Sequence, residues 1–286
     1  MMGKETYPPV TCINSTMEEP GLLELHHGSG IVFSTPAIDK VTGNEDAVAV
    51  IPLGEDALVL IVADGLGGLP AGATASRMVI ECMAGALTHA NLDEISIREV
   101  ILDSIERANR EILDLKNNSA TTLVVAEIQG NTLRTYHAGD SMIMLMGNRG
   151  KIKYSAIPHS PVGYALKSGL MDESEAMLDE EKHLISNYIG SPESHVEVGP
   201  VLKMSARDTL VLASDGLSDN LFENEVVEIC RKGDLLQAAR KLQENCRKYM
   251  VESAPDRICH PDDLSFILFR LGGSNREFLP IQGSWL

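Results

Sequence analysis

Acidic residues gather in five short clusters, and four of these stand where an apolar segment begins or ends. The four are Asn44-Glu45-Asp46, Asp64-Gly65-Leu66-Gly67-Gly68, Ser214-Asp215-Gly216-Leu217-Ser218-Asp219 and Asp262-Asp263, and the fifth, Gly139-Asp140-Ser141, lies in an expected turn. A carboxylate beside a buried interior is costly unless hydrogen bonds, a basic partner or a metal ion compensate its charge. The pattern therefore points to a polar site that binds cations at the edge of a sheet.

The residue types in these clusters favour hard divalent ions. Carboxylate and carbonyl oxygens select Mg²⁺ or Mn²⁺ over zinc. The one softer pair nearby, Cys259-His260, cannot complete a zinc shell, and we interpret it as loop. Several carboxylates that converge on one point can hold two ions about 4 Å apart, an arrangement that activates water for phosphoryl hydrolysis. The glycines after Asp64 let the backbone turn sharply and bring a carbonyl oxygen close to such an ion.

Each cluster on its own has a simpler structural explanation. An isolated Asp-Gly pair is usually a turn, and Asp64 or Asp215 could instead cap the N-terminus of a helix. What favours the metal-site interpretation is that all five clusters occur together, each next to a predicted strand or turn.

The bulk composition is that of a globular protein. A chain of 286 residues fits one large domain or two small ones, and a hydrophobic share of 44% is ample for a packed core. Acidic residues outnumber basic ones by 41 to 24, giving a formal charge of −17 and no basic footprint for nucleic acid. The acidity is most simply a source of solubility, and bound cations would neutralise part of it.

Cysteine usage and hydropathy bear on the cellular compartment. The five cysteines, Cys12, Cys82, Cys230, Cys246 and Cys259, are scattered and form no CxxC pair, which suits a reducing environment. The longest wholly apolar run, Ala57–Ala63, is too short to span a bilayer. Charges and Pro8-Pro9 stand where a signal peptide would need an apolar stretch. We expect a cytoplasmic monomer without membrane or nucleic-acid partners.

The apolar pattern predicts blocks of strands separated by pairs of helices. Short segments rich in Val, Ile and Leu predict strands at 31–35, 47–52, 57–63, 121–128, 132–137, 142–146, 152–154, 183–188, 209–214 and 264–271. Apolar residues at steps of three and four predict helices over 73–87, 95–115, 223–231 and 234–250. We expect residues 157–182 to form a loop with one short acidic helix.

This order of elements indicates an α+β protein rather than a strict βαβ alternation. Two antiparallel sheets packed face to face, with helix pairs outside, would bury the apolar surfaces of these segments. No linker rich in Pro, Ser and Gly divides the chain. We therefore expect one domain over 28–271, preceded by an irregular N-terminal arm at 1–27 and followed by a C-terminal tail at 272–286.

Taken together, these motifs resemble the metal-dependent protein phosphatase (PPM) family, the protein phosphatase 2C type, in its bacterial stand-alone form. The resemblance covers roughly residues 28–271 and implies a central β-sandwich flanked by helix pairs, in four α-β-β-α layers. The matching signatures are Asn-Glu-Asp-Ala at 44–47, Val-Ala-Asp-Gly-Leu-Gly-Gly at 62–68 with Ala75-Ser76, Ala120-Thr121-Thr122, Gly139-Asp140-Ser141, Ser-Asp-Gly-Leu-Ser-Asp at 214–219 and Asp262-Asp263-Leu264-Ser265.

The resemblance also implies a role for each site residue. Asp64 would bridge two Mn²⁺ or Mg²⁺ ions and the Gly65 carbonyl would bind one of them, while Asp215 and Asp262 would complete the other ion's shell. Glu45 and Asp46 would act through metal-bound waters, with Asp46 and Asp64 orienting the nucleophilic water. Asp140 and Asp219 match positions that hold a third, weaker ion in many relatives. We choose Asp262 over Asp263 because the family often has Asn at the second position, and because neighbouring strand residues point to opposite faces.

Two positions depart from the family pattern. Many relatives carry a phosphate-holding Arg where this chain has Val41. Lys40 is adjacent and could substitute weakly, since Lys lacks the bidentate fork that suits phosphate oxygens; the alternative is that Lys40 is a solvated surface residue. Leu66 stands where animal relatives have a His proposed as general acid, although bacterial members often carry an apolar residue there. A metal-bound water could protonate the leaving group instead.

Other segments carry weaker signals. His159-Ser160-Pro161-Val162-Gly163-Tyr164, with Lys167 and Gly169, resembles a mobile flap that lies beside the site in bacterial relatives, so His159 and Ser160 are candidate substrate contacts. The alternative is an ordinary surface loop. We interpret His26 and His27 as loop residues, and the sequence does not decide whether Trp285 packs on the domain or on a partner.

The resemblance implies a serine/threonine phosphatase that acts on phosphorylated proteins by direct attack of a water bridging two Mn²⁺ or Mg²⁺ ions. No Cys-x5-Arg phosphatase signature is present, which is consistent with a mechanism that has no phosphoenzyme. Two alternatives stay open. One is a catalytically weak relative that acts as a signalling scaffold, supported only by Val41, and the other is a hydrolase of small phosphoesters.

Overall fold

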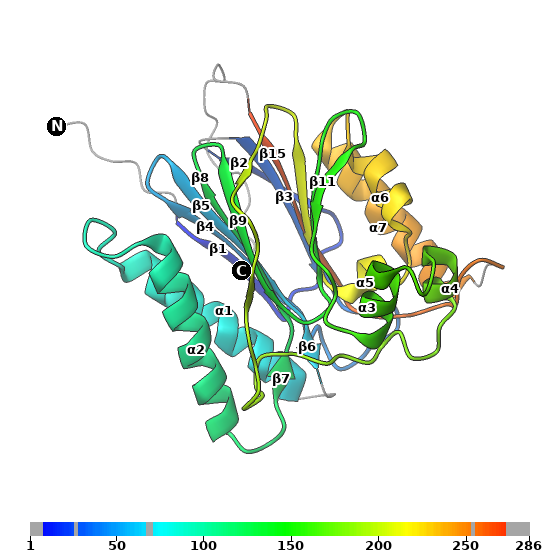
Figure 1. Cartoon of the computed structure of the whole chain (residues 1–286), viewed down its shortest axis with the longest axis horizontal. Coiled ribbons are helices and arrows are strands. Elements are labelled where there is room, and N and C mark those ends of the chain that lie inside the picture. Colours follow the sequence, from blue (N-terminus) through cyan, green and yellow to red (C-terminus); the bar gives the residue numbers. More distant parts are fainter. Residues whose placement is uncertain (1–7, 26–27, 67–70, 253–254, 273–286) are drawn as a thin grey trace.

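Two antiparallel β-sheets lie face to face at the centre of the molecule (Figure 1). The computed structural model describes residues 8–25, 28–66, 71–252 and 255–272. The predictions for His26, His27, Gly67, Gly68 and Trp285 fall outside these residues. Among the described helices, none is both long enough and apolar enough to cross a membrane.

The first sheet has the strand order β1-β4-β5-β8-β9-β12, with β13 also paired to β9. Its strands are β1 (Val10–Ile13), β4 (Ala47–Leu53), β5 (Ala57–Ala63), β8 (Leu123–Gln129), β9 (Thr132–Ala138), β12 (Glu197–Val198) and β13 (Leu202–Lys203). The second sheet has the order β11-β10-β14-β15-β3-β2. Its strands are β11 (Ile152–Ser155), β10 (Met142–Met146), β14 (Thr209–Ala213), β15 (Leu264–Leu271), β3 (Gly28–Thr35) and β2 (Gly21–Leu25).

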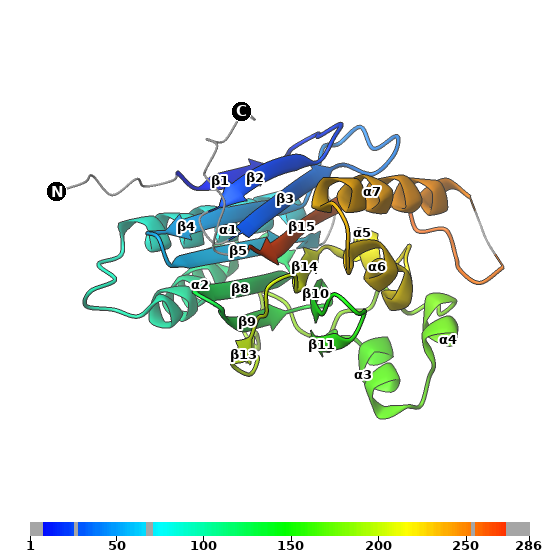
Figure 2. The same ribbon diagram turned by 90° about the horizontal axis from the view of Figure 1, so that it is seen from above.

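Helix pairs cover the two outer faces of the sandwich, so the layers follow the order α-β-β-α (Figure 2). Helices α1 (Ala71–His89) and α2 (Ile97–Asp114) pack on the first sheet, and α6 (Glu223–Cys230) and α7 (Leu235–Val251) pack on the second. A capping box formed by Ser96 and Glu99 fixes the start of α2. The predicted fold class is therefore confirmed.

Strand β5 is apolar throughout because both of its faces are covered. Leu58, Leu60 and Val62 belong to the core between the sheets. Val59 and Ile61 belong to the second core, beneath α1 and α2. Because side chains alternate along a strand, a strand with both faces covered needs apolar residues at every position.

The expectation of an irregular N-terminal arm is wrong for residues 10–13 and 21–25. Strand β1 pairs with β4 at one sheet edge, and β2 pairs with β3 at the edge of the other sheet. In β2 the signal is a short alternation in which Leu23 and Leu25 are buried while Leu22 is exposed. Such a brief pattern on an edge strand is easily missed, because only one face of the strand is covered.

The segment after β11 also differs from the prediction. Residues 157–182 contain two helices, α3 (Pro161–Ser168) and α4 (Glu173–Met177), where one was expected. Residues 183–188 do not form the predicted strand. The amide of Ser186 donates instead to the carbonyl of His159, and the side chain of Asn187 bonds with His159 and His195. These local partners take the place of a sheet neighbour.

Candidate metal centre

The strand register brings the acidic clusters to one end of the sandwich. Ala47 pairs with Ala63, so Asp46 before β4 and Asp64 after β5 lie side by side. In the other sheet Ala213 pairs with Phe266, which places the residues after β14 near those before β15. Antiparallel pairing therefore converts distant positions in the sequence into neighbours at one edge of each sheet.

Asp46, Asp64 and Asp215 form the centre of this acidic pocket. Burial raises the pKa of Asp46 to about 7, with the charge of Asp263 adding to the effect. Burial also raises the pKa values of Asp64 and Asp215, and the neighbouring carboxylates raise them further. Within the described residues, none of the three forms an ion pair with Lys or Arg. Such a group of buried carboxylates is unfavourable unless protons or cations compensate it.

The backbone and side chain of Asp46 are both fixed. Its amide donates to the side-chain oxygen of Asn44 at 2.9 Å. Its carboxylate accepts a hydrogen bond from the Ser214 hydroxyl at 2.8 Å. Ser214 in turn accepts from the amide of Ser265 at 3.0 Å, so its hydroxyl proton is directed towards Asp46. This chain of bonds orients one carboxylate of the pocket without neutralising it.

The backbone around Asp64 is held just as firmly. Its carbonyl accepts from the Thr121 hydroxyl at 2.7 Å and from the Thr122 amide at 2.8 Å. Its amide donates to the Thr122 hydroxyl at 3.1 Å. Gly65 follows in the short strand β6 (Gly65–Leu66), which pairs with β7 (Ala120–Thr121). A Cβ at Gly65 would lie 2.5 Å from the Gly72 backbone, so only glycine fits this close approach.

The alternative that Asp215 caps a helix is wrong, and Asp64 does not precede a helix in the chain. Asp64 precedes the short strand β6. Asp215 is the first residue of α5 (Asp215–Ser218), and the N-cap position belongs to Ser214. The Asp215 carboxylate is therefore not a helix cap, whereas Asp64 Oδ2 accepts a hydrogen bond from the Asp215 amide, at the start of α5, at 3.4 Å.

Two oxygen atoms support a cation site directly. Glu45 Oε1 and Asp140 Oδ1 are buried and have no hydrogen-bond partner among the described residues. The pKa of Asp140 is raised to about 7, mainly because the carboxyl group is buried and secondly because the charge of Asp219 lies nearby. Buried acceptors without donors are rare in folded proteins. The donor set therefore fits hard divalent cations, which prefer oxygen ligands.

Asp262 and Asp263 have different surroundings. Asp263 is buried, accepts from the amides of Ala37 at 2.8 Å and Glu45 at 2.6 Å, and pairs with Lys40 at 2.7 Å. Asp262 is exposed, and among the described residues its carboxylate accepts one hydrogen bond, from the Asp263 amide. Partial loss of hydration raises the pKa of Asp262 to about 6. The oxygens of Asp263 are already used, which favours Asp262 as the ligand.

Lys40 lies inside a network of carboxylates. Its ammonium nitrogen is 2.8 Å from Glu45 and 2.7 Å from Asp263. Burial opposes the charge of Lys40, but these two carboxylates outweigh it and raise the pKa. The alternative of a solvated surface residue is therefore wrong. Val41, at the position of the family's Arg, is 96% exposed and contributes no hydrogen-bonding group.

His159 and Ser160 are both buried at the base of α3. The Ser160 hydroxyl caps this helix by accepting from the Gly163 amide at 3.0 Å. Beside them, a cavity of about 370 Å³ separates α3 and α4 from the acidic pocket. The lining includes Ser160, Val162, Leu166 and Met177 on one side and Asp140, Asp215 and Asp219 on the other. His159 is absent from the lining residues.

Sequence reasoning did not anticipate a group of side chains behind His159. The rings of His137 and His159 stack with centroids 4.4 Å apart, and Glu197 lies 3.3 Å from His159 Nε2. These residue types could hold a transition metal. However, His159 Nδ1 accepts from the Gly139 amide and the Asn187 side chain, which leaves the ring proton on Nε2. His159 is thus a hydrogen-bonded anchor rather than a metal ligand.

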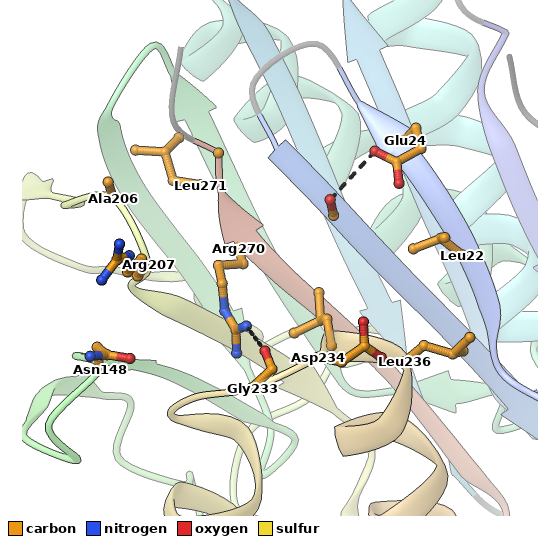
Figure 3. Close-up of a pocket in the computed structure, with 13 residues that line it drawn as sticks. Leu22, Glu24, Asn148, Ala206, Arg207, Gly233, Asp234, Leu236, Arg270 and Leu271 are labelled. Atoms are coloured by element: carbon orange, nitrogen blue, oxygen red, sulfur yellow. Dashed lines mark hydrogen bonds between the residues drawn. The ribbon is translucent and has the colours of Figure 1, made fainter. Parts of the chain in front are cut away.

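A larger cavity, of about 930 Å³, lies at the opposite end of the second sheet (Figure 3). Its lining includes Arg207, Asp234 and Arg270. The guanidinium of Arg270 donates to the backbone carbonyls of Gly233 and Cys230. No cluster of carboxylates converges among its lining residues, so this cavity lacks the features of a divalent-metal site.

Comparisons with known proteins agree with this arrangement. A family model for protein phosphatase 2C matches residues 35–254. The serine/threonine phosphatase stp of Listeria monocytogenes is 31% identical over 220 residues, covering 73% of this chain and 84% of that protein. The serine/threonine phosphatase structure from S. agalactiae gives a TM-score of 0.71 at 25% identity, covering 84% of this chain and 98% of that one.

A catalytic domain of the serine threonine protein phosphatase PstP, solved in complex with 2 manganese ions, has the same fold. Its TM-score is 0.65 at 22% identity, and the match covers 85% of this chain and 98% of that one. The fold and these matches define an enzyme of the serine/threonine protein phosphatase class. The chain belongs to the protein phosphatase 2C family, as the resemblance of its motifs indicated.

Proposed function

We propose that this protein hydrolyses phosphoserine and phosphothreonine esters in proteins with the help of two Mn²⁺ or Mg²⁺ ions held in the acidic pocket. The observation that carries the proposal is the meeting of Asp46, Asp64 and Asp215, which are packed together without a basic partner among the described residues. The manganese pair in the PstP structure supports the same number of ions.

The ligand set follows from the positions of the oxygens. Asp64 and the Gly65 carbonyl would hold one ion, and Asp64, Asp215 and Asp262 would hold the other. Glu45 and Asp46 would act through water, and the unpartnered Oε1 of Glu45 is available for this role. When bound, two such ions supply a bridging water of lowered pKa and offset charge on the phosphoryl oxygens.

The protein's own groups position the water and the leaving group. Ser214 donates to Asp46, so the remaining lone pairs of this carboxylate can accept a hydrogen bond from the attacking water. Position 66 is Leu, which cannot act as a general acid. The leaving alkoxide would therefore take its proton from water. The attack is direct and forms no phosphoenzyme.

Lys40 provides a weak contact for the substrate phosphate. A Lys ammonium has three N–H donors, and two of them are directed towards Glu45 and Asp263. One donor therefore remains for a phosphate oxygen at the mouth of the pocket. A single donor of this kind binds phosphate less specifically than the fork of an Arg.

A protein substrate fits the surroundings better than a small phosphoester does. The cavity beside the acidic pocket has an apolar wall made by Val162, Leu166 and Met177. Such a wall can receive a side chain of the substrate beyond the phosphorylated residue, which a small ester lacks. Proteins phosphorylated by a Ser/Thr kinase are thus the expected partners.

The test compares a phosphothreonine peptide with p-nitrophenyl phosphate, each with Mn²⁺ and with chelator. We expect turnover of both with Mn²⁺, a preference for the peptide, and loss of both activities with chelator. Asp103→Asn, which changes an exposed carboxylate on α2, serves as the matched control for variants of the pocket. Activity that survives chelation would refute the metal mechanism, and a preference for the small ester would refute the protein substrate.

A further inference from the structure

Lys182 places a fixed positive charge at the edge of the acidic pocket. It lies after α4, in a turn closed by its amide donating to the carbonyl of Asp179. Its ammonium nitrogen is 3.0 Å from Asp219 Oδ1 and 3.0 Å from the Ser218 carbonyl. The sulfur of Met177 lies 3.4 Å away. The three donors of the ammonium group thus all have neighbours on the protein.

The pair of Lys182 and Asp219 is largely shielded from water, with each side chain 14% exposed. This distinguishes it from the surface pairs of α1 and α2, such as Arg77 with Glu81, whose side chains are about half exposed. Exposed pairs contribute little because water and salt screen them, whereas shielded charges interact more strongly. Lys182 is therefore well placed to determine which other cations can approach Asp219.

Asp219 and Asp140 are the two residues that match the third-ion position of the family. Within the part of the chain that the structure describes, Asp140 Oδ1 is buried without a hydrogen-bond partner. The positive charge of Lys182 acts on this carboxylate as well. A divalent ion shared by the two carboxylates would have to displace the ammonium group or remain beside it. Displacement would break the shielded pair of Lys182 and Asp219. Coexistence would hold like charges close together where water is scarce.

We propose that Lys182 takes the place of a third divalent ion, so that the pocket holds two ions and a lysine rather than three ions. This inference rests on the two-ion centre of the proposed function and specifies its stoichiometry. The ion pair of Lys182 and Asp219 also connects the α3–α4 segment, residues 159–186, to the metal centre. Lys182 is on this view a positioning residue, which acts through a carboxylate rather than on the substrate.

The test counts bound manganese. The purified full chain is equilibrated with increasing free Mn²⁺ by dialysis, and bound metal is measured by mass spectrometry and by the electron paramagnetic resonance signal of free Mn²⁺. We expect two ions for the wild type at concentrations that saturate its tight sites. Lys182→Met should add a third ion, with an affinity for this ion on the order of tenfold or more above that of the wild type.

Matched variants separate charge from structure. Lys182→Arg keeps the positive charge and should bind two ions, while Lys182→Gln should behave like Lys182→Met and provides a second variant if either fails to fold. Lys167→Met removes an exposed cation that lines the same cavity and should leave the count at two. In the double variant Lys182→Met with Asp219→Asn, the third ion should be lost again.

The outcomes distinguish the two proposals. Three ions in the wild type, with no tighter third ion after Lys182→Met, would overturn the role of Lys182 and leave the two-ion centre intact. Binding of no ion by the folded wild type would overturn both. Two ions in the wild type and three in Lys182→Met would support the inference even if the hydrolytic activity of the variant were unchanged.

Discussion

Buried aspartates at the two ends of the sandwich differ in whether a basic side chain compensates their charge. At the start of β14, Asp208 is buried but accepts from the Ser205 amide and pairs with Lys153. At the same end, Arg270 donates to backbone carbonyls (Figure 3). At the acidic end, Asp46 and Asp64 are equally buried, yet no basic side chain among the described residues pairs with them. Removing the partner of a buried charge is destabilising because one charge is left uncompensated, whereas buried carboxylates without a partner need protons or cations.

The strongest test of this difference between the two ends is to neutralise one aspartate at each of them. Asp64→Asn should reduce hydrolysis of a phosphopeptide by roughly 1,000-fold or more, because a lost ligand disorders the ions. In the presence of chelator it should raise the melting temperature, since one repelling charge is removed. Asp208→Asn should leave turnover within a few-fold of wild type and lower stability by about 1–3 kcal/mol.

Both variants are measured by steady-state kinetics and by thermal unfolding in chelator. If Asp64→Asn retained activity, or destabilised the metal-free protein as Asp208→Asn does, the distinction between the two ends would be wrong.

A smaller effect is expected from the hydrogen bond that orients Asp46. Ser214→Ala removes the donor to this carboxylate, which should lower kcat by about tenfold, the loss of one bond worth roughly 1.4 kcal/mol. Without this donor the pKa of Asp46 should rise, so the acidic limb of the pH–rate profile should move to higher pH. Ser104→Ala removes another buried hydroxyl, in α2, and is the matched control. Equal profiles for the two variants would exclude a special role for Ser214.

Metal binding should stabilise the folded chain. At a free Mn²⁺ concentration about 100 times the dissociation constant, one site contributes roughly 2.7 kcal/mol. For a chain of this size that corresponds to an increase of roughly 5–10 °C in melting temperature. Differential scanning fluorimetry across a manganese series measures the shift, with Asp208→Asn as a variant that should retain it. A melting temperature independent of manganese would contradict a site at the acidic end.

The pH dependence of the metal-free protein provides a subtler test. In the folded state the pKa values of Asp46 and Asp140 are raised to about 7, and that of Asp262 to about 6, from the usual 3.8. Between about pH 4 and 7 the folded chain therefore binds more protons than the unfolded chain, so its stability should fall as pH rises. Urea unfolding in chelator should show this decrease, and saturating Mn²⁺ should weaken it. Stability that increases across this window would contradict the raised pKa values.

The sequence predicts those parts of the molecule where a local pattern and its tertiary surroundings agree. The apolar run of β5 and the helical spacing of α2 give the correct elements, because both segments bury the faces that their patterns indicate. The acidic clusters identified the residues of the pocket, since each follows or precedes a strand. The hydrogen bonds that fix them, such as that from Ser214 to Asp46, depend on strands far apart in the sequence.

What could not be predicted depends on contacts between distant segments. Residues 183–188 have the composition of a strand, but their polar groups find partners in His159. Lys182 ends the segment 157–182, for which the sequence predicts only a loop with one short acidic helix, and only the fold brings it to Asp219. The engagement of Lys40 by Asp263 is likewise invisible in the sequence, because more than 200 residues separate the two.

The central claim is that oxygens from separate strands capture a pair of hard cations at one end of the sandwich. Anomalous diffraction from crystals grown with manganese tests this most directly. Two manganese peaks that share Asp64, with Asp215 and Asp262 at one of them, are the predicted result. Absence of peaks among these carboxylates, or peaks only elsewhere on the molecule, would contradict the account.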